Sequence, residues 1–162
     1  MKKLQLTEWA AIGELLGTAA VIVSLLFLAY SVGQNTEAVH GSMENLLFER
    51  HAALQNNFIT DPAMADIYAR MQSGDAELTV VESVRWQTYQ TNLLDIWAFA
   101  YMRHEGSLLG EREWRNWDDY FAYVFAHGAE RLSAEDWRRM AYGFDPQFWA
   151  HVGQSLGYDS GN

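Results

Sequence analysis

The 162-residue chain contains no cysteine, only two prolines and, after position 3, no lysine. Without cysteine it cannot form disulfides, Cys-ligated zinc sites or a thiolate nucleophile, although the missing cysteine does not identify the cellular compartment. Both prolines follow an aspartate, in Asp61-Pro62 and Asp145-Pro146. This pairing is typical of a helix N-cap followed by a first-turn proline, so both prolines predict helix starts.

The chain also lacks the common catalytic motifs. It has no glycine-rich phosphate loop, no nucleophile elbow and no His-Glu-x-x-His pattern. Glu37-x-x-His40 followed by Glu44 resembles half of a helical di-iron site, but no second Glu-x-x-His occurs. We therefore expect no catalytic residues, no cofactor and no metal site. A metal carrier or enzyme built on these three residues would need a further carboxylate or histidine from another helix.

Positive charge is scarce in the distal part of the chain. Residues 34–162 contain nine arginines against 19 aspartates and glutamates. Binding a nucleic-acid backbone requires clustered lysine or arginine, so nucleic acid is excluded as an expected partner. The acidic surface is either a solvated face or a docking face for a basic partner.

Residues 15–33 contain no charged side chain. A helix of this length crosses about 28 Å of hydrocarbon, which is enough to span a bilayer. Trp9 and Tyr30 lie near the two ends, where amphipathic rings favour the lipid headgroups. The sequence therefore predicts a tail and transmembrane anchor over residues 1–33 and a helical domain over residues 34–162, with the lipid bilayer as one partner.

A secretory signal is the alternative interpretation of this N-terminal segment. Lys2 and Lys3 precede the apolar run, and Ala29-x-Ser31 has the small residues of a cleavage site. However, the run is longer than the roughly 7–15 residues of a usual signal core, and Glu8 and Glu14 are unusual ahead of it. These features favour an anchor.

One face of the predicted anchor is rich in small residues. This small-residue seam consists of Ala10, Gly13, Gly17, Ala20, Ser24 and Ser31, at helical spacing and with Phe27 among them. Small residues let a second helix approach closely. The seam predicts packing against a transmembrane helix of another integral membrane subunit or of a second copy; the alternative is a lipid-facing helix that happens to contain many small residues.

The distal domain is predicted to be all-α, a bundle of about five to six helices that the anchor enters without a break. Expected helices cover 34–60, 61–73, 79 to beyond 100 and 111–127, with two more beginning at 133 and 145. Thr79-x-x-Glu82 has the spacing of a capping box. His51 lies on the apolar stripe of the first of these helices, so we expect a core histidine bonded to a neighbour.

The helix over 111–127 carries six aromatic residues: Trp114, Trp117, Tyr120, Phe121, Tyr123 and Phe125. They form either an exposed aromatic docking face or, for the four on one stripe, part of the core. Asp118 and Asp119 are adjacent in sequence, so their side chains diverge, and we expect a solvated face there.

The N-terminal segments Trp9-Ala-Ala-Ile-Gly-Glu14, Val21-Ile-Val-Ser-Leu25, Leu28-Ala-Tyr30 and Gln34-Asn-Thr36 are similar to the opening of a large group of uncharacterised bacterial single-pass membrane proteins. The resemblance covers about the first 40 residues and implies a bacterial inner (cytoplasmic) membrane location. It carries over no functional residues, because the group has no assigned activity.

The orientation in the membrane stays open at this stage. Members of the group usually carry an arginine before Gln-Asn-Thr, which would hold the distal domain in the cytoplasm, whereas this chain has Ser31-Val-Gly33. Lys2 and Lys3 instead favour a cytoplasmic N-terminus and a domain on the far side.

Two functional hypotheses follow from these patterns. The first is a membrane-anchored interaction protein, an accessory or assembly subunit whose seam packs against other transmembrane helices. The alternative is a sensory or ligand-binding module with an aromatic-lined pocket in the helical domain.

Overall fold

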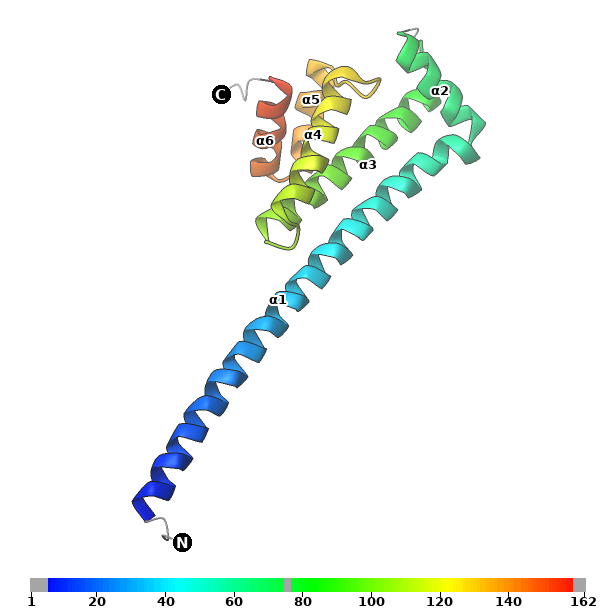
Figure 1. Ribbon diagram of the computed structural model, residues 1–162. Helices are drawn as coiled ribbons and strands as arrows, with labels where there is room; N and C mark the ends of the chain where they lie inside the picture. The colour runs from blue at the N-terminus through cyan, green and yellow to red at the C-terminus, as the bar shows by residue number, and fades with distance from the viewer. Residues whose placement is uncertain (1–5, 75–76, 159–162) are drawn as a thin grey trace. The chain divides into compact units, whose positions relative to one another are not determined.

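The computed structural model describes residues 6–74 and 77–158, and within them it is all-α (Figure 1). Six α-helices and one short 3-10 helix follow in order: α1 (Leu6–Thr60), α2 (Pro62–Ser73), α3 (Val80–Glu105), α4 (Glu111–His127), α5 (Ala134–Met140), η1 (Ala141–Gly143) and α6 (Pro146–Leu156). This confirms the predicted fold class, a long N-terminal apolar helix followed by a helical bundle.

The predicted helix starts are confirmed by their caps. Asp61 accepts hydrogen bonds from the first turn of α2, and Asp145 does the same for α6, each with proline at the first helical position. Thr79 and Glu82 form a reciprocal capping box at the start of α3. Each cap satisfies backbone N–H groups that the helix itself leaves unpaired.

The chain divides into two compact units, Met1–Val39 and His40–Asn162, and α1 contributes to both. In the first unit the side chains from Trp9 onward are exposed except for the half-buried Val39, and most are apolar. The second unit contains the hydrophobic core. We call this second unit the helical domain.

The core of the helical domain is built around Trp97 on α3. Its indole stacks on Phe121 and Phe125 of α4, with ring centroids 5.8 and 5.9 Å away. Phe148 of α6 meets the same indole edge-on at 5.9 Å. All four rings are fully buried, so α3, α4 and α6 share one aromatic centre.

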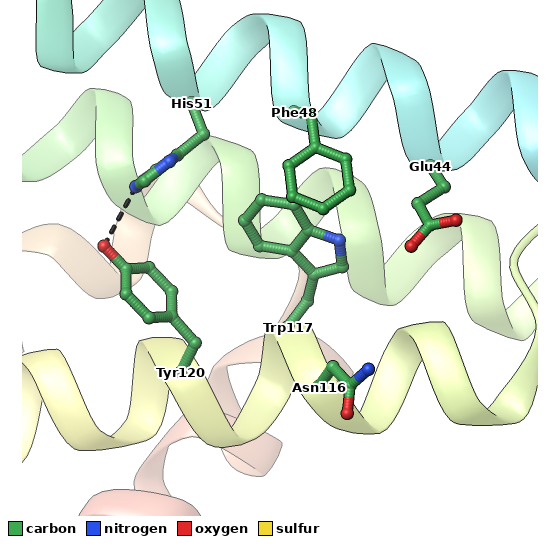
Figure 2. Close-up of a pocket in the computed structure, with 6 residues that line it drawn as sticks. All are labelled: Glu44, Phe48, His51, Asn116, Trp117 and Tyr120. Carbon is green, nitrogen blue, oxygen red and sulfur yellow. Dashed lines mark hydrogen bonds between the residues drawn. The ribbon is translucent and has the colours of Figure 1, made fainter.

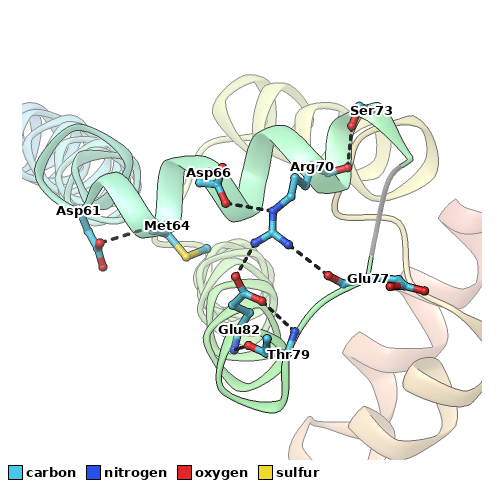
Figure 3. A network of polar contacts seen from close by, with 8 residues as sticks. All are labelled: Asp61, Met64, Asp66, Arg70, Ser73, Glu77, Thr79 and Glu82. Carbon is cyan, nitrogen blue, oxygen red and sulfur yellow. Dashed lines mark hydrogen bonds and ion pairs between the residues drawn. The ribbon is translucent and has the colours of Figure 1, made fainter.

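The α2–α3 corner is held by Arg70 of α2 (Figure 3). Its guanidinium donates to Asp66 at 2.9 Å, to the backbone oxygen of Glu77 at 3.1 Å and to Glu82 in the capping box of α3. The pKa of Glu82 is lowered by hydrogen bonds with the backbone and the side chain of Thr79 and with the Arg70 guanidinium. The carboxylate therefore stays charged where it both caps α3 and binds α2.

One expectation about charged residues is wrong. Asp118 does not lie on a solvated face: one carboxylate oxygen accepts hydrogen bonds from the Trp97 indole and from Nε2 of His151, both at 2.7 Å. Asp119, the next residue, is exposed. The reason is tertiary, because the buried indole N–H on α3 needs an acceptor and α4 presents Asp118 to it.

We expect Asp118→Ala to lower the free energy of unfolding of the helical domain by about 2 kcal/mol, because the buried Trp97 N–H would be left unpaired. Urea unfolding of the full chain in detergent, followed by tryptophan fluorescence, measures this loss. Asp119→Ala is the matched control and should stay within about 0.5 kcal/mol of wild type. Equal stability of the two variants would contradict the assigned role of Asp118.

Candidate functional site

One helix among the described residues is long and apolar enough to cross a membrane, and it lies near the N-terminus. The candidate span is the Trp9–Thr60 part of α1, which has a mean hydropathy of 2.2 in its most apolar window and buries none of that window within the chain. Trp9 and Tyr30 are both exposed on it. Lys2 and Lys3, on which the orientation argument depends, lie outside the described residues.

The small-residue seam is exposed along its whole length, from Ala10 to Ser31. A Cβ added at Gly13 or Gly17 would meet no atom within 4 Å. The hydroxyl of Ser24 donates to the backbone oxygen of Ala20 at 2.8 Å, so this polar group is satisfied within the helix. The seam therefore has no unpaired hydroxyl donor at Ser24. Packing of a second helix on it remains a prediction.

The six-residue aromatic docking face is not found. Trp114, Trp117, Phe121 and Phe125 are buried in the core, as the single-stripe alternative requires. Tyr120 is half-buried, and only Tyr123 is largely exposed, at 66 %. The physical reason is that one face of α4 packs on α3 and α6, and only the residues off that face reach solvent.

His51 on α1 and Tyr120 on α4 form a hydrogen-bonded pair, 2.9 Å between Nε2 and the hydroxyl oxygen (Figure 2). The amide nitrogen of Gln55 also lies 3.4 Å from Nε2. A neutral His51 ring can accept the hydrogen bond of the Tyr120 hydroxyl at Nε2. The expected hydrogen bond to a neighbour is confirmed, but His51 is half-buried and is not part of the core. Burial lowers the pKa of His51, which favours the same neutral form.

Beside this pair lies a cavity of about 250 Å³ between α1 and α4, lined by Glu44, Phe48, His51, Asn116, Trp117 and Tyr120. We call it the aromatic groove. Figure 2 shows the Phe48 ring over the Trp117 indole, and their centroids are 5.0 Å apart. Phe48 is 55 % exposed, whereas Trp117 is only 7 % exposed and forms the floor. The groove is open to solvent on one side.

The three residues of the di-iron-like pattern do not converge on one another. Nε2 of His40 lies 3.2 Å from the backbone oxygen of Ser107, in the connection after α3. Glu44 belongs to the aromatic groove. Within residues 6–74 and 77–158 no group of three or more histidine, aspartate or glutamate side chains is arranged to hold a metal ion.

Glu130 is a polar feature that sequence reasoning missed. It is only 3 % exposed, and its carboxylate accepts a hydrogen bond from the hydroxyl of Tyr89 at 3.1 Å. Gln90 donates to its backbone oxygen at 3.0 Å. Burial and the nearby Glu130 charge raise the pKa of Tyr89, so the tyrosine remains a donor. A single glutamate in a turn carries no sequence signal of burial.

The lowered pKa of His51 predicts a pH-dependent contribution to stability. As the pH falls below the ordinary value of 6.5, the unfolded chain takes up a proton at His51 before the folded chain does. The stabilising contribution is thus complete above 6.5 and is lost as the pH falls. We expect acidification from about pH 7.5 to about pH 5.5 to lower the thermal midpoint more in wild type than in His51→Gln.

All other residues are the same in both proteins, so the difference between them isolates His51. The midpoints are measured by circular dichroism on the full chain in detergent. An equal loss in both proteins would show that His51 titrates alike in the folded and unfolded states.

Comparisons with family models, with curated proteins and with solved structures find no match to this chain. Its function is therefore inferred from its own residues and their geometry.

Proposed function

We propose that this chain is a single-pass protein of the bacterial cytoplasmic membrane that acts as an accessory or assembly subunit. Its tail and anchor, residues 1–33, would pack the small-residue seam against a transmembrane helix of another subunit or of a second copy. The observation that carries the proposal is the wholly exposed seam on an apolar helix, with open space beside Gly13 and Gly17. The bacterial location is supported by the resemblance of the first 40 residues.

The apolar surface supports the membrane location on energetic grounds. Leu15, Val21, Leu25 and Leu28 are all exposed in the chain. In water each such side chain would forgo the roughly 1.5–3 kcal/mol that burial provides. Lipid hydrocarbon removes this penalty for every face of the helix at once, whereas a soluble partner would cover only one face.

Arginine in the middle of the anchor should prevent insertion. Each arginine at the centre of a transmembrane helix raises the free energy of membrane insertion by about 2.5–3.5 kcal/mol. We therefore expect the double variant Val21→Arg/Leu25→Arg to be found in the soluble fraction or to be degraded. Alkaline carbonate extraction of membranes measures this, with Val21→Leu/Leu25→Val as the control. Release of a shortened wild-type chain, shown by its intact mass, would favour the secretory-signal interpretation.

A bulky residue in the seam should block helix association. We expect Gly17→Leu to lower crosslinking in membranes at least about fivefold, because close approach of two helices depends on small residues at the contact. Ala19→Leu is the matched control, since it adds a leucine on the same helix but off the seam. Crosslinking of Gly17→Leu at the wild-type level would contradict association through this face.

A second candidate function is favoured by the aromatic groove. A cavity lined by aromatic rings with a few polar groups at its edge is typical of small-molecule sites. The groove lies wholly within the helical domain. Under this alternative the chain is an anchored ligand-binding or sensory module, and the ligand binds in the groove.

A further inference from the structure

We infer that the aromatic groove binds a small organic cation, a free quaternary ammonium compound. The inference rests on the ligand-binding candidate function and not on association through the seam. Four aromatic rings and one carboxylate carry it: the rings of Phe48, His51, Trp117 and Tyr120, and the side chain of Glu44. Aromatic faces beside a carboxylate are the chemistry that attracts a quaternary ammonium group.

The rings form walls rather than a stack. Phe48 and Trp117 meet at 57°, His51 and Trp117 at 70°, and Trp117 and Tyr120 at 87°. These are tilted and edge-to-face contacts, and the groove is lined by Phe48 and His51 from α1 and by Trp117 and Tyr120 from α4. The Phe48 ring is half-exposed, so a guest reaches this electron-rich ring without moving a buried side chain.

The charge around the groove suits a cation. Glu44 lies at its edge (Figure 2) and, within the described residues, its carboxylate takes part in no hydrogen bond or salt bridge. Arg112 is close enough for its charge to interact with Glu44. That guanidinium, however, is bound to Glu113, with Nη2 2.7 Å from a carboxylate oxygen. Glu44 is therefore left to bind a cation supplied from solution.

The His51 ring is compatible with the binding of a cation in the groove. Burial favours the neutral form of His51, whose Nε2 can accept a hydrogen bond from the Tyr120 hydroxyl 2.9 Å away. A protonated imidazole would repel a cationic guest, whereas a neutral one adds a further aromatic wall.

The size of the groove and the charges around it limit which compounds can bind there. Its volume of about 250 Å³ is below the roughly 300–1,000 Å³ of sites for drug-sized ligands, so it suits a small compound. Residues 34–162 carry nine arginines against 19 acidic residues, and Glu44 lies beside the groove. A phosphate attached to the ammonium group would be repelled here, which favours a free quaternary ammonium compound over a phosphocholine headgroup.

The test is a titration of the full chain in maltoside micelles with choline, followed by the indole N–H resonances of ¹⁵N-labelled tryptophan. The Trp117 resonance is assigned from Trp117→Phe. We expect choline to shift it in a saturable way, with a dissociation constant of about 1 mM. The neutral isostere 3,3-dimethylbutan-1-ol should bind at least about fivefold more weakly, since it lacks the charge. Phosphocholine should also bind more weakly than choline.

Three variants connect the binding to named side chains. Phe48→Leu keeps an apolar side chain but removes the ring, and should weaken choline binding about two- to fivefold. Glu44→Gln should weaken it about threefold and reduce its dependence on salt. Tyr123→Leu removes an exposed aromatic residue of α4 outside the groove and should leave the affinity unchanged.

The outcomes separate the inference from the candidate function. Equal binding of choline and its neutral isostere would mean that the groove takes apolar guests, which overturns the cation assignment but keeps a ligand site. Tighter binding of phosphocholine would assign the groove to a headgroup instead of a free cation. No saturable shift with any of the three compounds would overturn both the inference and the ligand-binding candidate, and would leave the seam proposal untouched.

Discussion

The helical domain depends on the burial of one indole, that of Trp97. It stacks on Phe121 and Phe125 of α4 and forms an edge-to-face contact with Phe148 of α6. Its N–H must also be satisfied, because an unpaired donor in the core costs about 1–3 kcal/mol. Asp118 supplies the acceptor and at the same time binds His151. The buried Trp97 side chain of α3 thus contacts both α4 and α6 and holds the three helices together.

This arrangement also determines which aromatic residues remain available at the surface. With one face of α4 committed to the core, Trp117 lies at the boundary, where it forms the floor of the aromatic groove. Tyr120 reaches His51 on α1 and closes one side. Phe48 completes the groove and stays half-exposed. The groove is therefore a consequence of how α1 and α4 meet, and its acidic edge at Glu44 selects for positive charge.

The apolar part of α1 obeys a different constraint. Between residues 15 and 33 the helix has no charged face opposite an apolar one. Packing against one neighbouring surface would therefore leave apolar side chains exposed on the other side. A bilayer would cover all faces, and under the proposed function the small-residue seam would set the direction from which a second helix packs. The proposed location and association both follow from this one segment, whereas the proposed ligand site depends on the helical domain alone.

Several features follow from local sequence. The caps at Asp61, Thr79 and Asp145 involve residues within a few positions of one another, so spacing alone predicts them. The uninterrupted apolar segment and the periodic apolar stripes of the other helices are likewise visible in the local sequence. The burial of Glu130, the role of Asp118 and the assembly of Phe48 with Trp117 were decided only by tertiary structure. In each case the partner lies tens of residues away on another helix, so its identity depends on how the helices pack.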